Sequence, residues 1–261
     1  MAVSIEKKYQ KLTDTEHVLL RPGMYVGSIK PHTEEVFLPM KGKDQFQLTE
    51  VTYNPGFLKL FDEIVSNSVD EHKRNAKLNK VKVDIDMATG QISIWDNGGI
   101  PVKIHKEYDE WVPEMIFSNL KAGSNFDDTE DRVVVGTNGV GSTLTNIFSK
   151  EFIIETCDGK KQFVQTFKNN MSDRTKAKIT NKKTAFTKIT YLTDFERFGL
   201  KGINKNHYLM ITKRLIDIAA CNPTLKIFLN DKPIAFRTFK DYASRYVTPV
   251  FYDQSEHWKI G

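Results

Sequence analysis

Hydrophobic residues recur at helical spacing in the segment that follows Asn54-Pro55-Gly56. At about 100° per residue these side chains fall on one side of a helix; they are Phe57, Leu58, Phe61, Ile64 and Val65. Measured around the helix axis, Glu63 lies roughly 100 to 200° away from these apolar side chains. Asn67 lies about 40° to one side of Glu63, and Asp70 lies about 20° to the other side. The pattern predicts an amphipathic helix whose polar face is either solvated or part of an active site.

Alternating apolar and polar residues mark the strands. The stretch 81–96 alternates on both sides of the turn Ala88-Thr89-Gly90, which predicts a hairpin with Asp96 at the tip of its second strand. The rest of the pattern predicts hairpins near 35–52 and 230–231, helices over 112–120, 206–220 and 239–246, and strands over 151–156, 162–167, 177–180 and 186–192. The loop 121–137 is either a lid over a ligand or a surface loop, and the two are compatible.

Composition indicates one large soluble domain. The chain has 261 residues, of which 39% are hydrophobic and 27% charged, enough for a sizeable core. No stretch resembles a membrane span, and residues 1–8 are too polar for an export signal. Cys157 and Cys221 are better interpreted as reduced core residues than as a disulfide, and the histidines show no zinc-site spacing with them. We therefore expect a cytoplasmic protein with no membrane partner.

The charge of the chain permits contact with nucleic acid without demonstrating it. The net charge is +5 and the isoelectric point is near 8.9. The densest basic stretch comprises Lys160, Lys161, Arg174, Lys176, Lys178, Lys182 and Lys183. These residues form either a solvated face or a surface for DNA.

A glycine-rich segment, Gly136-Thr-Asn-Gly-Val-Gly-Ser-Thr143, precedes an apolar helix. Glycines let the backbone come close to a ligand, and a helix that starts near Val140 directs free N–H groups at anionic oxygens. The segment lacks the Gly-Lys-Ser/Thr of a Walker A loop and the strand and acidic residue of a dinucleotide fold. Alone, it is either a phosphate cradle or a glycine turn that starts a helix.

Two other segments make an ATP site the better interpretation. Glu63 can take a proton from a water that attacks a γ-phosphate, and Asn67 offers an oxygen to Mg²⁺, with Asp70 behind it. Asp96 can accept a hydrogen bond from an exocyclic amine such as adenine N6, and the glycines after it leave room for the base. Taken alone, the polar helix face is more often solvated, and Asp96-Asn-Gly-Gly is an ordinary turn.

Together, these segments resemble the GHKL, or Bergerat-fold, ATPases and, within them, the ATPase region of type IIA DNA topoisomerases. The resemblance covers nearly the whole chain, in order, at 9–28, 61–67, 123–128, 138–149 and 226–230. The sequence of residues 138–149 is most similar to that of the ATPase subunit of T4-like bacteriophage topoisomerases. The sequence of residues 9–28 also resembles eukaryotic topoisomerase II. This favours a phage protein that works in the bacterial host cytoplasm.

The resemblance implies an α+β fold, a two-layer α/β sandwich in which helices cover one face of a mixed, mostly antiparallel sheet. It divides the chain into an N-terminal arm or strap (1–28), an ATP-binding domain (29–246) and the start of a link to a transducer domain (247–261). It also implies that ATP closes a homodimer gate for DNA strand passage. The tyrosine that cleaves DNA is expected in another region or subunit.

By matching position, the resemblance implies that Glu63 is the general base, Asn67 the Mg²⁺ ligand and Asp96 the adenine partner. It implies ATP contacts from Asn67, Asp70, Asp96, Gly98, Ser124, Asn125, Gly136, Thr137, Asn138, Gly139, Val140, Gly141, Ser142, Thr143 and Thr187. Tyr9 matches a residue of the arm that reaches the nucleotide of the partner subunit.

Two departures from the family pattern affect these expectations. The family usually has a residue between the two glycines that here adjoin as Gly98 and Gly99. The transducer lysine that reaches the γ-phosphate is also missing, so we expect a piece of a longer subunit that hydrolyses ATP weakly. The rival interpretations are another GHKL ATPase, of the chaperone or mismatch-repair type, and a DNA-binding module that does not hydrolyse ATP.

Overall fold

The computed structural model describes residues 5, 9, 11–122, 139–234, 236, 238–247, 253–255 and 259–260. Its centre is one large sheet with the order β10 (Lys178–Asn181), β8 (Lys161–Lys168), β7 (Ser149–Cys157), β11 (Phe186–Thr193), β4 (Gln91–Asp96), β3 (Lys80–Ile85), β12 (Lys226–Leu229), β13 (Lys232–Ile234). A short strand, β9 (Asp173–Arg174), pairs with β8. Strands β12 and β3 are parallel, and the other neighbours are antiparallel, which confirms the predicted mixed sheet.

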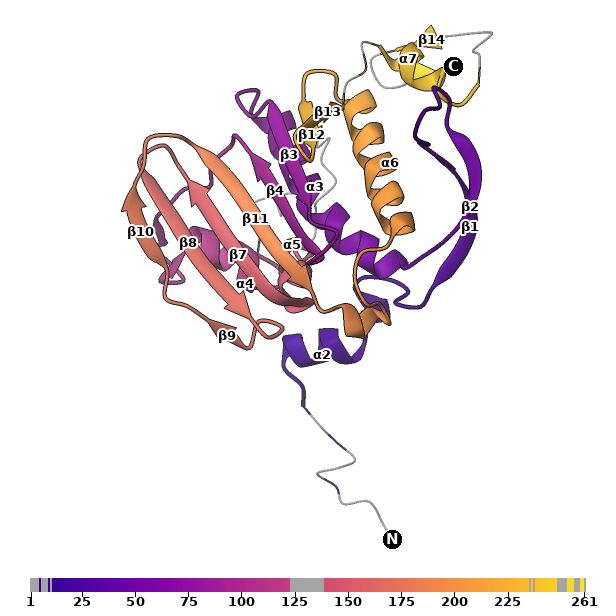
Figure 1. The fold of residues 1–261 in the computed structure, drawn as a ribbon. Helices are drawn as coiled ribbons and strands as arrows, with labels where there is room; N and C mark the ends of the chain where they lie inside the picture. Colours follow the sequence, from indigo (N-terminus) through magenta and orange to yellow (C-terminus); the bar gives the residue numbers. More distant parts are fainter. Residues whose placement is uncertain are drawn as a thin grey trace.

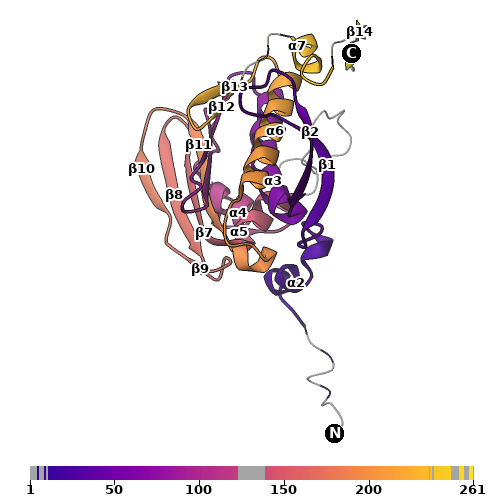
Figure 2. The same cartoon turned by 45° about the vertical axis from the view of Figure 1, so that its right-hand side comes forward.

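Helices cover one face of this sheet (Figures 1 and 2). They are α3 (Pro55–Arg74), α4 (Val112–Ser118), α5 (Gly141–Ile147) and α6 (Lys205–Cys221). The hairpin of β1 (His32–Leu38) and β2 (Gln47–Tyr53) lies on the far side of the helices from the sheet, as Figure 2 shows, and contacts α6. The two-layer arrangement of sheet and helices predicted from the resemblance is therefore confirmed.

The start of α3 is fixed by a buried cap. Asn54 is fully buried, and its side-chain oxygen accepts a hydrogen bond from the backbone N–H of Phe57 at 3.0 Å, as an N-cap residue does. The Asn54 backbone N–H donates to Nε2 of His207 on α6 at 2.9 Å. Burial lowers the pKa of His207 to about 4, which keeps its ring neutral and able to accept that bond. The cap thus ties the first turn of α3 to α6.

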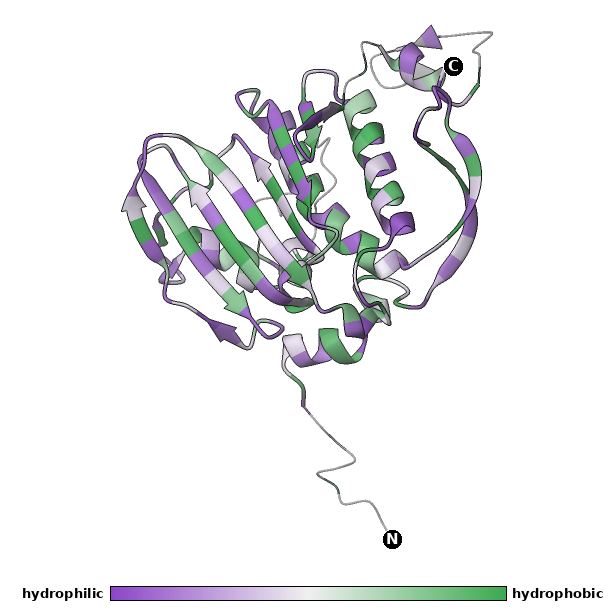
Figure 3. Cartoon of the chain, in the orientation of Figure 1, coloured by the Kyte–Doolittle hydropathy of each residue, from purple (hydrophilic) through white to green (hydrophobic). Residues whose placement is uncertain are grey.

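Alternation along the strands builds the core between the sheet and the helices. Apolar and polar positions alternate along β7, β8 and β11 in Figure 3, as expected where one face of a sheet is buried. The inward side chains include Phe152 and Ile154 on β7, Phe163 and Phe167 on β8, and Ile189 and Tyr191 on β11, each at most 3% exposed. The helices bury Phe57, Leu60, Phe61, Ile64 and Val65 of α3 against them.

The hydrophobic pattern does not predict the short elements, except for the last helix, which it places over 239–246. They are α2 (Asp14–Leu20), η1 (Pro22–Met24), β5 (Ile104–His105), β6 (Glu110–Trp111), η2 (Phe195–Phe198), α7 (Phe239–Ala243), β14 (Asp253–Gln254) and β15 (Lys259–Ile260). Helix α2 starts with a capping box between Thr13 and Glu16. Its Val18 is fully buried in the core, so this part of the predicted arm packs on the domain.

The loop predicted over 121–137 lies mostly outside the described residues, which stop at Ala122 and resume at Gly139. Among the residues that the structure describes, no helix is long and apolar enough to cross a membrane.

Candidate functional site

A cavity of about 550 Å³ lies among α3, the strand ends and the glycine-rich segment. Its lining brings together residues that are far apart in the sequence. The predicted site residues among them are Glu63, Asn67, Asp96, Gly98, Gly139, Val140, Gly141, Ser142 and Thr187. The three segments that the sequence analysis singled out therefore meet at one place.

Asp96 is a buried carboxylate at one end of this cavity. It is 7% exposed and ends β4, between β3 and β11 in the sheet. Its Oδ2 accepts a hydrogen bond from the Ser68 hydroxyl at 2.7 Å, and its Oδ1 accepts one from the backbone N–H of Gly98 at 2.9 Å. Burial raises the pKa of Asp96 to about 6, because these two bonds offset only part of the cost of removing the charge from water.

The adjoining glycines after Asp96 have a steric reason. A Cβ at Gly98 would come within 2.7 Å of Leu78 Cδ1. A Cβ at Gly99 would overlap the carbonyl of Cys157 on β7, whose carbonyl carbon would lie 3.1 Å away. No side chain fits at either position without a shift of its neighbours. The close approach of this loop to Leu78 and to β7 therefore favours glycine at both positions.

Thr187 lies beside Asp96 because β11 pairs with β4. The two residues are directly opposite each other in the antiparallel register. The Thr187 hydroxyl is hydrogen-bonded to the Thr156 hydroxyl at 2.9 Å, and the latter contacts the carbonyl of Phe186 at 3.0 Å. This chain of bonds orients the Thr187 hydroxyl at the cavity wall.

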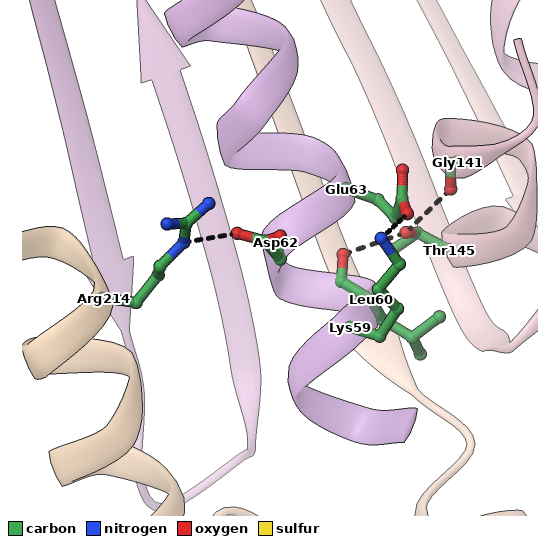
Figure 4. Close-up of polar contacts among 7 residues, drawn as sticks. All are labelled: Lys59, Leu60, Asp62, Glu63, Gly141, Thr145 and Arg214. Atoms are coloured by element: carbon green, nitrogen blue, oxygen red, sulfur yellow. Dashed lines mark hydrogen bonds and ion pairs between the residues drawn. The ribbon is translucent and has the colours of Figure 1, made fainter. Parts of the chain in front are cut away.

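Glu63 also lines the cavity and lies against the start of α5 (Figure 4). Lys59, one turn earlier on α3, forms an ion pair with Glu63, with 2.5 Å between Nζ and Oε1. A Cβ at Gly141 would overlap the Glu63 carboxylate, whose Cδ would lie 2.5 Å away. The hydroxyl of Thr145 donates to the Leu60 carbonyl at 3.0 Å, which fastens α5 to α3. The Glu63 carboxylate is thus held between the Lys59 ammonium group and Gly141.

The neighbouring Asp62 points to the other side of α3. Figure 4 shows its carboxylate directed at Arg214 of α6, and the Nε–Oδ1 distance is 2.6 Å. This ion pair joins the helix that carries Glu63 to α6. The two adjacent carboxylates of α3 therefore have different surroundings.

The contact at Gly141 gives the first prediction. Gly141→Ala should displace the Glu63 carboxylate or the start of α5, because the new methyl group has no space. We expect a loss of about 1–3 kcal/mol in the free energy of unfolding, as is typical of overpacking, and a larger proportional loss of any ATP hydrolysis. Chemical denaturation and an ATPase assay check both. Gly23→Ala is the steric control, since nothing lies within 4 Å of a Cβ there and its φ is not in the left-handed region. Equal hydrolysis in Gly141→Ala and the unchanged chain would contradict the expectation.

Not every predicted site residue lies at the cavity. Asp70 is 2% exposed and is not among the described residues that line it. Thr143 is also buried outside the lining, where its hydroxyl donates to the Asn119 carbonyl at 3.0 Å and secures α5 to the end of α4. Tyr9 is 70% exposed and does not line the cavity either. Ser124, Asn125, Gly136, Thr137 and Asn138 lie outside the described residues.

The sequence analysis missed two kinds of cavity residue. Ser68 and Lys59 contact the predicted carboxylates, but a serine and a lysine on a helix carry no distinctive signal. The apolar walls are Ile94, Val112, Ile116, Phe117 and Ile189, which the hydrophobic pattern cannot distinguish from the core. A cavity with apolar walls and a few polar groups is typical of a small-molecule site.

No group of three or more His, Cys, Asp or Glu side chains among the described residues could hold a metal ion. Mg²⁺ usually keeps several waters and binds through one or two protein oxygens together with substrate phosphates. Asn67 is exposed at the cavity and presents an amide oxygen one turn from Glu63. The donor set therefore fits a magnesium ion that arrives with a phosphate ligand, and does not fit a site made by the protein alone.

Comparison with known proteins shows close relatives along nearly the whole chain. It is 43% identical over 273 residues to DNA topoisomerase 2 of Acanthamoeba polyphaga mimivirus, which covers 99% of this chain and 22% of that protein. It is 42% identical over 259 residues to DNA topoisomerase 2 of Arabidopsis thaliana, which covers 97% and 17%. The chain thus spans about a fifth of the length of these curated relatives. No family model matches it.

Solved structures agree with the sequence relatives. The ATPase region of Saccharomyces cerevisiae topoisomerase II superposes with a TM-score of 0.92 at 35% identity, covering 96% of this chain and 69% of that one. The ATPase and transducer domains of topoisomerase II from Balamuthia mandrillaris superpose with a TM-score of 0.92 at 37% identity, covering 97% and 67%. The chain therefore belongs to the type IIA DNA topoisomerase family, to the GHKL ATPase region of these enzymes.

Proposed function

We propose that this chain binds and hydrolyses ATP and that this drives closure of a dimer gate for DNA strand passage. The observation that carries the proposal is the meeting of Asp96, Asn67 and Glu63 at one cavity. A buried acceptor, an exposed amide and a carboxylate held beside a helix start are the groups that an adenine, a magnesium ion and an attacking water each require.

Asp96 is the proposed adenine partner. Its buried carboxylate already accepts one hydrogen bond at each oxygen and has further lone pairs. An exocyclic amine donates to such an acceptor, and the flat base fits where Gly98 and Gly99 lack side chains. The apolar walls Ile94 and Ile189 lie on β4 and β11, the strands that carry Asp96 and Thr187.

In this proposal, the phosphates of ATP lie at the start of α5. Within the described part of the chain, no side chain caps the first turn of α5, and backbone N–H groups at a helix start are donors for anionic oxygens. When bound, Mg²⁺ would offset phosphate charge, with Asn67 as its proposed protein ligand. Glu63 is the proposed general base, and Lys59 and Gly141 hold its carboxylate in place.

The wider assignments belong to the same proposal. We propose a homodimer whose gate includes the 1–28 arm with Tyr9, the 29–246 ATP-binding domain, and a 247–261 link to a transducer domain. DNA cleavage would be carried out by a separate subunit or region. From the resemblance, we also propose a T4-like phage source and a cytoplasmic location.

Calorimetric titration of a non-hydrolysable ATP analogue with Mg²⁺ tests the nucleotide site directly. Saturable binding to the chain supports the proposal, provided that free adenosine competes. If the folded chain shows no binding heat at any nucleotide concentration in the titration, the proposed function does not hold for this chain.

Asn67→Ala should weaken binding of the magnesium–nucleotide complex about tenfold, because one oxygen ligand of several is lost. Binding of the same nucleotide in excess chelator should change far less, since Asn67 then has no ion to coordinate. Two calorimetric titrations, with and without Mg²⁺, measure the difference. Asn75→Ala is a matched control at the end of α3 and outside the cavity lining. An equal loss with and without Mg²⁺ would assign Asn67 to the nucleotide itself.

A further inference from the structure

Four lysines gather where the ends of two neighbouring strands meet. We call Lys160, Lys161, Lys182 and Lys183 the lysine corner. Lys161 starts β8 and lies opposite Asn181, the last residue of β10, and the backbone N–H of Lys182 donates to the Lys160 carbonyl at 3.1 Å. All four residues are exposed, at the start of β8 and just after the end of β10, which is the edge strand of the large sheet in Figure 1.

In the part of the chain that the structure describes, none of the corner lysines forms an ion pair, whereas several other basic residues of the same sheet do. Arg174 pairs with Glu114 at 2.9 Å, and Lys168 pairs with Glu151 at 3.3 Å. Among the described residues, the ion pairs include none of the four corner lysines. Four like charges in so small an area repel one another unless an anion lies between them.

The nearest carboxylate in sequence does not cancel this charge. Asp158 is the only acidic residue of the stretches 157–163 and 179–186. Its Oδ1 accepts the backbone N–H groups of Lys160 and Lys161, both at 2.8 Å, and its Oδ2 accepts that of Val102 at 3.1 Å. Asp158 therefore shapes the turn between β7 and β8. These backbone bonds lower its pKa and the charge of Lys160 helps to lower it, but its carboxylate forms no ion pair within 4.0 Å with any of the four lysines.

We propose that the lysine corner is a contact surface for the phosphate backbone of duplex DNA. Lysine ammonium groups on flexible stems neutralise phosphates without reading bases, so the contact is independent of DNA sequence. Lys182 is partly fixed by the ring of Phe186, whose centroid lies 4.4 Å from Nζ. The choice of DNA as the polyanion rests on the proposed topoisomerase function, and the chemistry of the surface rests on the four lysines.

The position of the corner adds a reason for a functional contact. The turn that carries Lys160 and Lys161 is bonded to the loop that follows Asp96. The Val102 N–H of this loop donates to Asp158 in the turn. The Ile100 N–H of the same loop donates to the Thr156 hydroxyl at 3.1 Å, near the end of β7. Duplex DNA at the lysine corner therefore lies next to the rim of the nucleotide cavity. If the four lysines only prevented the sheet edge from pairing with another strand, they would not need to lie near the nucleotide cavity.

Fluorescence anisotropy with a labelled duplex of about 30 base pairs, without nucleotide, tests the proposal between about 50 and 200 mM salt. The double variant K182Q/K183Q should bind more weakly, and its slope of log affinity against log salt should be shallower by about 2, since two phosphate contacts are lost. K182R/K183R should restore affinity. The matched control K201Q/K205Q removes two exposed lysines near the start of α6 and should leave the slope unchanged.

The proposal is overturned if the unchanged chain does not bind duplex at low salt, or if both double glutamine variants lose the same affinity. Binding of the ATP analogue is measured on the same variants by calorimetry. We expect it unchanged in K182Q/K183Q, so a failure of the DNA contact leaves the nucleotide site intact. A chain that binds DNA through the corner but binds no nucleotide would overturn the proposed ATPase function instead.

Discussion

Asp96→Asn should abolish binding of the ATP analogue while making the unliganded chain more stable at about pH 8. The carboxamide can keep its oxygen toward the Gly98 N–H and turn its NH₂ group toward the Ser68 hydroxyl, so the internal bonds survive. The second N–H of the carboxamide then faces the position proposed for the adenine amine, so two hydrogen-bond donors oppose each other. We expect affinity to fall by about a hundredfold or more, measured by calorimetry.

The gain in stability follows from the pKa of Asp96. Burial raises this pKa from 3.8 in the unfolded chain to about 6 in the folded one. A raised pKa means that the protonated carboxyl stabilises the fold fully below about pH 3.8, and that this stabilisation is lost as the pH rises through about 6. Above that pH the ionised group costs on the order of 2–3 kcal/mol, at about 1.4 kcal/mol per pKa unit. Asparagine does not ionise and avoids this cost.

Urea denaturation at about pH 8 and about pH 4 separates the two effects, because the advantage of Asp96→Asn should disappear at the lower pH. Ser68→Ala is the control: it removes a hydrogen bond to Asp96 and leaves the carboxylate, so binding should persist. A variant Asp96→Asn that binds the analogue like the unchanged chain would remove Asp96 from the adenine site.

Glu63→Gln should reduce the rate of ATP hydrolysis by about 10²- to 10⁴-fold, the usual contribution of a general base. Glutamine has the same shape and cannot accept the proton of the attacking water. Binding of the ATP analogue should change little, because Glu63 acts on the water and not on the nucleotide. Single-turnover hydrolysis of radiolabelled ATP measures the rate, since this assay detects slow turnover that a steady-state assay misses.

A matched carboxylate distinguishes a base from general electrostatics. Glu151→Gln also breaks a lysine ion pair, that with Lys168 on β8, and it lies outside the cavity lining. It should leave hydrolysis within a few-fold of the unchanged chain. If the two glutamine variants lose the same rate, Glu63 is not the base. If Glu63→Gln loses binding instead of rate, its carboxylate has a role in holding nucleotide.

The local pattern was sufficient to predict the elements that carry the site. Helical spacing placed Glu63 and Asn67 on the polar side of a helix, and the structure brings both to the cavity. Strand alternation placed Asp96 at the end of a hairpin, where β4 ends. These features depend on residues within a few positions of one another, and the period of a helix or strand is a local property.

The partners of these residues were decided by the tertiary structure. Thr187 lies opposite Asp96 only because β11 pairs with β4, although the two strands are about 90 residues apart in the chain. Ser68 turns out to bond the carboxylate of Asp96, and Gly141 to touch that of Glu63. The helical pattern also grouped Asp70 with Asn67, whereas the fold buries Asp70 and exposes Asn67 at the cavity.

The same division between local sequence and tertiary structure applies to the charged residues. The sequence showed a basic stretch, but only the tertiary structure distinguished Arg174, whose carboxylate partner Glu114 lies on α4, from the four lysines of the corner. Likewise, an aspartate after a strand is visible in the sequence, whereas its raised pKa requires the surrounding layers that exclude water. The sequence by itself therefore determined the elements and the chemical groups, because backbone periodicity acts locally. The tertiary structure decided burial, partners and pKa, because these arise from contacts between segments that are distant in the chain.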